Sequence, residues 1–320
     1  MKWNIAYLGT YHPAEETLKR LINDGWVRVV VVPESGGFKN DNIISMAEAA
    51  NIPWTCELAE IEQYEINLVL AANYPKLVPE AMLEKYQCIN THWSGLPRYR
   101  GVHPTAWALL NLDYRIGVTV QVMDAEFDTG DVLAQDFMDI SPEMTILELH
   151  KKLAIVQADL VEHVLKVYLD TGRWEKTKQD ESKASYVPKR VPEDGIIDWN
   201  WPTERIWNLV RALTPPVYPG AFTYIGRDKI IIPEAMPAAS PEYFCTPGQV
   251  VRVMKNGGVW VKTRDTCLEV SMIIKGDDRP VSAGQVLKRG DKLGFNPQLE
   301  IPRLQAMMDD IYNQLSRLTK

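Results

Sequence analysis

Cysteine is scarce in this sequence, and none of its spacings suits cysteine chemistry. The four cysteines are Cys56, Cys88, Cys245 and Cys267; they form no Cys-x-x-Cys pair, and no histidines have the spacing of a zinc motif. Structural zinc sites need such pairs, and disulfide frameworks are typical of secreted chains with many cysteines. We therefore expect a cytoplasmic protein with reduced thiols and no metal.

Long apolar runs and an excess of positive charge are also absent. No uncharged apolar stretch approaches the ~20 residues of a membrane-spanning helix. The first residues lack the apolar core and cleavage site of a secretory signal. The formal net charge is −7, which disfavours a surface built for nucleic acid or anionic membranes. At 320 residues the chain can still bury a sizeable core, in one domain or two.

A dinucleotide-binding fingerprint is missing from a sequence that otherwise alternates strands and helices. The expected strands cover residues 3–9, 27–33, 68–72 and 88–91, and helical patterns cover residues 14–24 and 42–50. The turn after the first strand, residues 9–13, lacks the GxGxxG spacing that brings a backbone close to a pyrophosphate. The pattern predicts a Rossmann-like, mostly parallel α/β sheet without a nicotinamide cofactor.

The composition changes in the second half of the chain. A helical pattern opens at Ser141 and runs to about Tyr168, and residues 176–197 are polar and proline-bearing, as linkers are. Further on, short β runs with glycine turns predict a small barrel or sandwich. The pattern at 301–318 predicts an amphipathic helix.

Three polar residues stand at the ends of two predicted strands. Asn90 and His92 are two residues apart, so their side chains share one face, and Asp128 follows a second apolar run. An amide beside an imidazole can stabilise a developing oxyanion, typically worth about 10²–10³ in rate per donor. No nucleophile elbow surrounds Ser94, which favours direct attack by a substrate amine and hence acyl transfer. A purely structural histidine would fit the same spacing.

The residues around this cluster resemble one family. The resemblance rests on Asn90-x-His92, Ser94-x-Leu96-Pro97-x-Tyr99-Arg100-Gly101, Gly117-Val118-Thr119, Asp128-Thr129-Gly130-Asp131 and, further on, Ile197-Asp198-Trp199 and Tyr218-Pro219-Gly220-Ala221-Phe222. Their order and spacing are similar to those of the 10-formyltetrahydrofolate-dependent formyltransferases. The resemblance covers nearly the whole chain. It implies a catalytic domain over 1–185, a linker over 186–203 and a smaller OB-like β domain with a terminal helix over 204–320.

The same resemblance implies roles for the site residues. The acceptor amine would attack the formyl group of 10-formyltetrahydrofolate, Asn90 and protonated His92 would stabilise the oxyanion, and Asp128 would position His92 and help to move the proton. His92 could instead be the base. The folate would be bound by Asn73, Tyr74, Lys76, Leu77, Met123, Asp124 and Asp128.

Two members of the family share this two-domain length: the amino-sugar nucleotide formyltransferases and methionyl-tRNA formyltransferase. The tRNA enzymes resemble one another in a basic loop after the second strand, whereas here residues 33–40 carry one acid and one base. His103 and Pro104 resemble the catalytic loop of the sugar enzymes. We therefore expect a nucleotide-linked amino sugar, of the kind used in lipopolysaccharide or O-antigen biosynthesis, rather than a nucleic acid.

The expected acceptor contacts all lie near the carboxyl ends of the strands. They are Tyr11, Ser94, Arg98, Tyr99, Arg100 and His103. Arg98, Arg100 and His103 could instead anchor the loop by hydrogen bonds. A homodimer through the β domain is a further implication of the resemblance to the sugar enzymes. The alternatives are methionyl-tRNA formyltransferase, an enzyme for another small amine, and a non-catalytic folate-binding regulator.

Overall fold

The computed structural model describes residues 2–34, 40–276, 279–294 and 297–318. The chain divides into two compact units, Met1–Val191 and Pro192–Lys320. Each unit contains a hydrophobic cluster of its own. Residues 35–39, in the loop on which part of the acceptor prediction rests, lie outside the described residues.

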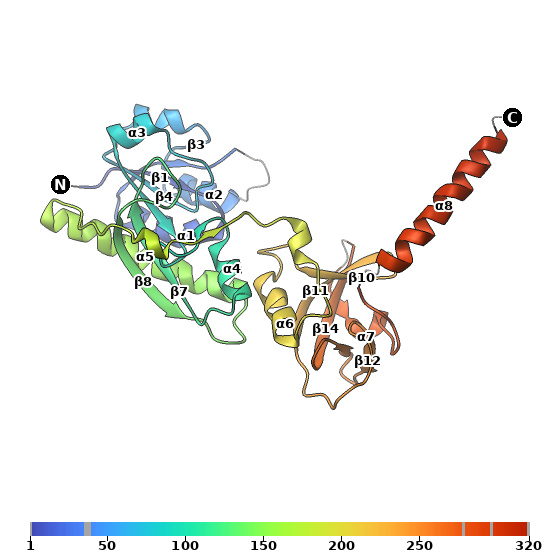
Figure 1. The fold of residues 1–320 in the computed structure, drawn as a ribbon. Coiled ribbons are helices and arrows are strands. Elements are labelled where there is room, and N and C mark those ends of the chain that lie inside the picture. The colour runs from blue at the N-terminus through green and yellow to red at the C-terminus, as the bar shows by residue number, and fades with distance from the viewer. Residues whose placement is uncertain (1, 35–39, 277–278, 295–296, 319–320) are drawn as a thin grey trace. The chain divides into compact units, whose positions relative to one another are not determined.

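A seven-stranded sheet in the order β3-β2-β1-β4-β5-β7-β8 forms the centre of the first unit (Figure 1). Its strands are β1 (Ile5–Gly9), β2 (Val27–Val31), β3 (Trp54–Thr55), β4 (Leu68–Ala72), β5 (Gln87–His92), β7 (Arg115–Val122) and β8 (Val132–Asp139). Strands β1 to β5 pair in parallel, whereas β7 pairs antiparallel with both β5 and β8. The prediction of a mostly parallel α/β sheet is confirmed.

Helices cover both faces of this sheet, as the fully apolar strands β1 and β4 require. The helices are α1 (Tyr11–Asn23), α2 (Asp41–Ala49), α3 (Glu80–Lys85), α4 (Pro104–Leu110) and α5 (Ile146–Thr171), with a 3-10 helix η1 (Leu58–Gln63). Ala6 of β1 packs with Ile61 of η1, whereas Tyr7 points the other way and donates its hydroxyl hydrogen to the Ala14 carbonyl of α1. Helix α1 begins at Tyr11, so the turn that follows β1 is shorter than the sequence pattern predicts.

The caps of α5 explain where this long helix begins and ends. The Thr145 hydroxyl accepts from the Glu148 amide, and the Glu148 carboxylate accepts from the Thr145 amide, which is a capping box. Gly172 ends the helix with a left-handed backbone, φ +74°. The sequence pattern predicts a start at Ser141, and the helix begins at Ile146 instead because the capping box lies at Thr145.

Part of the polar segment with linker composition pairs within the first unit. Strand β9 (Tyr186–Val187) forms a two-stranded parallel sheet with β6 (Arg100–Gly101). Thr177 pairs with Val132 of β8. Between them lies a 3-10 helix, η2 (Glu181–Lys183). Residues 177–187 are therefore bonded to β8 at one end and to the loop that follows β5 at the other.

The second unit contains an antiparallel sheet in the order β10-β11-β14-β13-β12, with β15 paired to β14. Its elements are η3 (Pro192–Gly195), α6 (Thr203–Ala212), β10 (Ala221–Ile225), β11 (Asp228–Pro237), β12 (Val250–Val253), β13 (Val259–Lys262), β14 (Cys267–Lys275), β15 (Val281–Ser282), α7 (Ala283–Val286) and α8 (Pro297–Leu318). The prediction of a smaller β domain after the α/β domain is confirmed.

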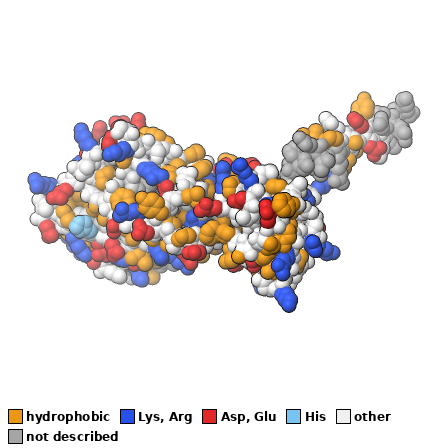
Figure 2. Space-filling model, turned by 60° about the horizontal axis from the view of Figure 1, so that its bottom comes forward, with side chains coloured by type: hydrophobic (Ala, Val, Ile, Leu, Met, Phe, Trp, Pro, Cys, Tyr) orange, Lys and Arg blue, Asp and Glu red, His pale blue; other side chains and the backbone are white. Residues whose placement is uncertain are grey.

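Two kinds of feature are absent from the described residues. None of the helices within them is long and apolar enough to span a membrane. The same residues contain no cluster of three or more histidine, cysteine, aspartate or glutamate side chains that could hold a metal ion. On the face shown in Figure 2, basic and acidic side chains are interspersed.

Candidate active site

The carboxyl end of β5 brings the three predicted catalytic residues together. Asn90 and His92 lie on the same face of β5, and Asp128 lies in the loop between β7 and β8. The Asp128 Oδ1 atom is 3.4 Å from His92 Nδ1 and accepts a hydrogen bond from Asn90 Nδ2 at 3.5 Å. Asn90 pairs with Gln121 of β7, and Gln121 Nε2 donates to Asp128 Oδ1 at 3.1 Å, which holds Asp128 of the following loop beside Asn90.

The contacts of His92 define which nitrogen faces the site. Nε2 lies 2.8 Å from the Tyr99 carbonyl oxygen, which can only accept, so Nε2 carries the hydrogen of this bond. Nδ1 is then the nitrogen that faces the Asp128 carboxylate. The imidazole is buried and contacts Tyr99 through Nε2 and Asp128 through Nδ1.

The Asp128 carboxylate is oriented by three donors. Besides Asn90, Gln121 Nε2 donates to Oδ1 at 3.1 Å, and the Gly101 amide donates to Oδ2 at 2.9 Å. Gln121 lies on β7 directly opposite Asn90. The backbone of Asp128 is left-handed, with φ +62°. The donors offset the strain of this conformation and fix the direction of the carboxylate.

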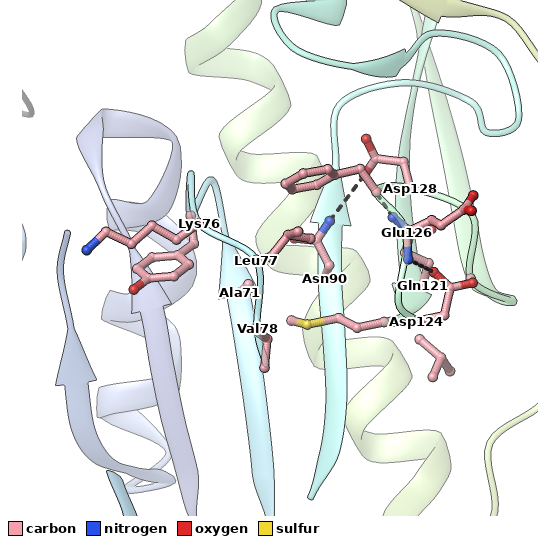
Figure 3. A pocket seen from close by; sticks show the side chains of 14 residues that line it. Ala71, Lys76, Leu77, Val78, Asn90, Gln121, Asp124, Glu126 and Asp128 are labelled. Atoms are coloured by element: carbon pink, nitrogen blue, oxygen red, sulfur yellow. Dashed lines mark hydrogen bonds between the residues drawn. The ribbon is translucent and has the colours of Figure 1, made fainter. Parts of the chain in front are cut away.

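A small cleft, partly open to solvent, borders this cluster. Figure 3 shows Lys76, Leu77 and Val78 on one side of it and Gln121, Asp124 and Asp128 on the other, with Asn90 between them. The predicted folate contacts that line the cleft are Tyr74, Lys76, Leu77, Met123, Asp124 and Asp128. Asn73 is not among the lining residues. Its Nδ2 donates to the Thr10 carbonyl at 3.0 Å and ties the end of β4 to the end of β1.

Four of the predicted acceptor contacts form hydrogen bonds to other residues of the protein. The Ser94 hydroxyl donates to the Arg98 carbonyl at 2.6 Å, and Arg98 Nη2 bonds Asp113 at 2.8 Å. The Tyr99 hydroxyl accepts from Asn111. The Arg100 guanidinium is 1% exposed and bonds Gln179, Glu181 and Tyr186. The contacts of Arg98 and Arg100 agree with the alternative prediction, in which these arginines anchor the loop by hydrogen bonds.

The other two predicted acceptor contacts begin helices. Tyr11 is the first residue of α1 and His103 is the N-cap residue of α4, and both have a left-handed backbone. Burial lowers the pKa of His103, and the charges of Arg190 and Lys189 lower it further. Near neutral pH the His103 imidazole is therefore uncharged.

A further buried histidine, which the sequence patterns did not single out, lies on α5 next to α4. The His150 Nε2 atom is 2.9 Å from the Thr105 hydroxyl, and the ring packs edge-on against Trp93 with centroids 4.9 Å apart. Burial, with repulsion from His12 and His103, lowers the pKa of His150 to about 3. Its imidazole is neutral and acts in packing.

Two glutamines that contact Asp128 were not predicted from the sequence. Gln121 holds the Asp128 carboxylate, and Gln179 bonds the Asp128 carbonyl at 2.9 Å. Gln121 had a detectable signal, because it is a polar residue in the alternating apolar pattern of residues 117–123. Gln179 had none, since it lies in a polar segment 51 residues away from Asp128.

This sheet, with a polar cluster beside a cleft at the carboxyl ends of its strands, has the common architecture of α/β enzymes, which bind their ligands at these strand ends. The chain matches the family model described as formyl transferase over residues 5–165, and the model of the formyl transferase C-terminal domain over residues 189–290. It belongs to the formyl transferase family and is a formyl-transferring enzyme.

Curated relatives match most of the chain. A methionyl-tRNA formyltransferase of Ruminiclostridium cellulolyticum is 30% identical over 314 residues, which are 91% of this chain and 99% of that protein. A methionyl-tRNA formyltransferase of Geobacter sulfurreducens is 31% identical over 271 residues, which are 79% of this chain and 83% of that protein.

Solved structures share the fold at lower identity. An N-formyltransferase of Helicobacter canadensis, solved with folinic acid and dTDP-3-aminofucose, has a TM-score of 0.62 at 19% identity and covers 86% of this chain and 100% of its own. A methionyl-tRNA formyltransferase of Clostridium thermocellum has a TM-score of 0.54 at 18% identity, with the same coverage. At these identities the structures establish the fold alone.

The relatives overturn the predicted acceptor. Proteins named methionyl-tRNA formyltransferase match at 30% identity or more over most of both chains, so the expectation of a nucleotide-linked amino sugar is wrong and the tRNA alternative is favoured. The expectation rested mainly on two short loops and on the net charge of −7. One of the loops includes residues 35–39, and in the other His103 serves a left-handed helix cap, a backbone role that says little about the acceptor.

Proposed function

We propose that this enzyme transfers the formyl group of 10-formyltetrahydrofolate to the α-amine of methionine on initiator tRNA. The observation that carries the proposal is the cluster of Asn90, His92 and Asp128 at the edge of the cleft between β4 and the β7–β8 loop. The names of the curated relatives support the acceptor. Structural neighbours solved with tetrahydrofolic acid or folinic acid support the donor.

The cleft has the composition expected of a site for a flat heteroaromatic ring. Leu77, Val78 and Met123 supply apolar walls, and Asp124 and Asp128 supply polar groups. A few polar groups in an apolar cleft are typical of small-molecule sites, where they fix the orientation of the ligand. We assign Tyr74, Lys76, Leu77, Met123, Asp124 and Asp128 to the folate.

The reaction follows from the positions of the three polar side chains. The acceptor amine attacks the formyl carbon and forms a new C–N bond, and the carbonyl oxygen becomes an oxyanion. In the proposed step, Asn90 Nδ2 and the Nδ1–H of a protonated His92 donate to that oxygen. The Asp128 carboxylate takes up the amine proton. The bond from the formyl carbon to N10 then breaks, and N10 takes up the proton.

Basic residues near the catalytic loop support a polyanionic acceptor. Lys189 and Arg190 lie close enough to His103 to lower its pKa, and the Arg190 guanidinium lies over the Trp107 ring at 5.1 Å. Positive charge at this edge of the sheet suits the phosphates of an RNA end. The charge is local, because the whole chain carries −7.

An acceptor comparison tests the proposal. Purified enzyme with 10-formyltetrahydrofolate is given methionyl initiator tRNA or, in parallel, free-amine nucleotide sugars, and tetrahydrofolate release is measured. We expect turnover with the tRNA and none with the sugars. Turnover with a sugar but not with the tRNA would overturn the acceptor, and turnover with neither would overturn the proposal.

A further inference from the structure

The segment between the two family matches runs along the catalytic loop. The Thr177 and Val132 backbones exchange two hydrogen bonds of 2.8 Å. At the other end of the segment, Ser185 donates its amide to the Pro97 carbonyl at 3.1 Å and accepts from the Arg100 amide at 2.8 Å. Residues 177–187 form a strap fastened at both ends, and Gln179 lies within it.

The Gln179 side chain joins the strap to the Asp128 loop. Its Nε2 donates to the carbonyls of Asp128 at 2.9 Å and Gly130 at 2.8 Å, and lies 3.3 Å from Gln121 Oε1. Its Oε1 accepts from Arg100 Nε at 3.2 Å and Nη2 at 2.8 Å. The amide has one orientation, since a flipped group would set its oxygen against three acceptors and its NH₂ against a guanidinium.

Gln179 reaches the Asp128 carboxylate by two routes. One is the Asp128 carbonyl itself, on a residue whose φ of +62° is held by its contacts. The other is Gln121, whose Oε1 contacts Gln179 and whose Nε2 donates to the carboxylate. Gly130 is constrained as well, because a Cβ there would lie 1.8 Å from the Val122 carbonyl oxygen. The direction of the carboxylate toward His92 therefore depends on the strap.

We propose that Gln179 is a positioning residue for the formyl transfer, which fixes the β7–β8 loop so that the Asp128 carboxylate faces His92. This proposal rests on the role given to Asp128 in the proposed function. Small misplacements of a catalytic group cost rate more than affinity. Loss of the Gln179 amide should therefore lower kcat, and should change the KM values for both substrates far less.

Gln179→Glu tests the role with little change of shape, because it replaces the donor by an oxygen and leaves the bonds from Arg100 possible. We expect kcat to fall by roughly tenfold to a hundredfold. Asn208→Asp in the second unit is the control, since Asn208 also joins a carbonyl, that of Glu204, to an arginine, Arg211. The control should lower the melting temperature and leave kcat unchanged.

The double variant with Asp128→Asn separates positioning from general stability. If Gln179 acts through Asp128, adding Gln179→Glu to Asp128→Asn should lower kcat no further. A folded Gln179→Glu variant with normal kcat, or a full additional loss in the double variant, would overturn the proposal. Normal activity of Asp128→Asn alone would instead overturn the proposed catalytic role. If Gln179→Glu does not fold, Gln179→Met serves in its place.

A separate observation concerns the apolar face of α8. Its residues Ile301, Leu304, Met308, Ile311 and Leu315 follow one another at alternating spacings of three and four, and each is 48% to 69% exposed. This spacing is that of a coiled-coil seam. An amphipathic helix is only marginally stable in water unless its apolar face is packed. In the described residues, the side chains of Ile301, Leu304, Met308 and Ile311 stay about half exposed or more.

The charges of α8 point to a second copy of the same helix. The described acidic side chains Asp309 and Asp310 lie away from the seam, and the glutamines Gln305 and Gln314 flank it, so these described positions place no like charges along the seam of two copies. The helix is not rich in Lys or Arg, which disfavours RNA or an anionic membrane as the occupant. We infer that α8 pairs with α8 of a second chain in a two-fold dimer.

Sedimentation of the full chain over a range of concentrations tests this pairing. The wild-type chain should sediment as a dimer, and Ile311→Asp should sediment as a monomer because it places a charge in the seam. Ala306→Lys, on the opposite face of α8, should remain a dimer. A monomeric wild-type chain, or an Ile311→Asp variant that stays a dimer, would contradict the inference.

Discussion

Backbone strain concentrates at the residues of the site. Among the described residues, seven other than glycine have positive φ, and five of them were singled out from the sequence: Tyr11, Asn73, Tyr99, His103 and Asp128. Each such conformation costs about 1–2 kcal/mol outside glycine. It persists because each residue is bonded in place, as Asp128 is by Gln121, Gln179 and Gly101. These hydrogen bonds therefore offset the cost of the strained backbone at these residues.

His92→Asn should remove the imidazole without disturbing the fold. We expect kcat to fall by about 10²–10³, because one oxyanion donor is removed. Single-turnover assays with 10-formyltetrahydrofolate measure the decrease, and the melting temperature serves as the control. A folded variant with near-normal kcat would contradict the catalytic role of His92.

His150 should make the protein lose stability in acid. Its folded-state pKa of about 3 lies below the ordinary value of 6.5, so between these pH values the unfolded chain binds one more proton than the folded chain. The free energy of unfolding therefore falls as the pH drops below 6.5, by up to about 1.4 kcal/mol per unit for this group. Urea unfolding at several pH values should show a shallower fall in His150→Gln. Equal slopes in both proteins would contradict this assignment.

At the scale of elements, helix caps and strand ends determine where the candidate site residues lie. The carboxyl ends of the parallel strands β1, β4 and β5 lie on the same side of the sheet. The antiparallel strand β7 leads into the loop that contains Asp128. The capping box at Thr145 sets the start of α5, which carries His150. The strap over residues 177–187 is bonded to β8 and to the loop after β5, next to the site.

Thr145→Ala should destabilise the first unit without affecting catalysis. The loss of an N-cap costs about 1 kcal/mol, which corresponds to roughly 2–4 °C in melting temperature for a unit of this size. Ser141→Ala is the matched control, because Ser141 lies at the start that the sequence pattern predicts but outside the helix. Calorimetry should show a shift for Thr145→Ala alone. Equal shifts in the two variants would mean that the capping box does not stabilise α5.

At the scale of the whole molecule, net charge is a poor guide to the acceptor. The value of −7 sums charges over both units, and Figure 2 shows acidic and basic groups interspersed on one face. A binding surface for RNA needs only a local group of cations. We propose Lys189 and Arg190, which lie close to His103 in the first unit, as such a group.

The double variant Lys189→Glu, Arg190→Glu should therefore bind methionyl-tRNA more weakly. We expect its KM for the tRNA to rise about tenfold, and the dependence of that KM on salt to become less steep, by about one unit of log–log slope for each phosphate that is no longer neutralised. The KM for 10-formyltetrahydrofolate should not change. Arg173→Glu, after the end of α5, is the matched charge reversal and should leave the tRNA KM unchanged. An unaltered tRNA KM in the double variant would contradict the assignment.

The local features of this protein follow from the sequence by itself. Continuous apolar runs predict buried parallel strands such as β1 and β4, and the two-residue period of a strand places Asn90 and His92 on one face. Motif order and spacing predict the family. These properties depend on neighbours along the chain, where periodicity and spacing can be read directly.

Only the tertiary structure decided how the site is held. The Gln179 amide meets the Asp128 carbonyl across 51 residues, and Arg100 is buried by Gln179, Glu181 and Tyr186 from a segment that has the composition of a linker. Composition records the polarity of that segment, but its hydrogen bonds form only once β5, β7 and the strap are packed together. Contacts between residues far apart in sequence depend on the folded arrangement of the strands, which leaves no periodic signal in the chain.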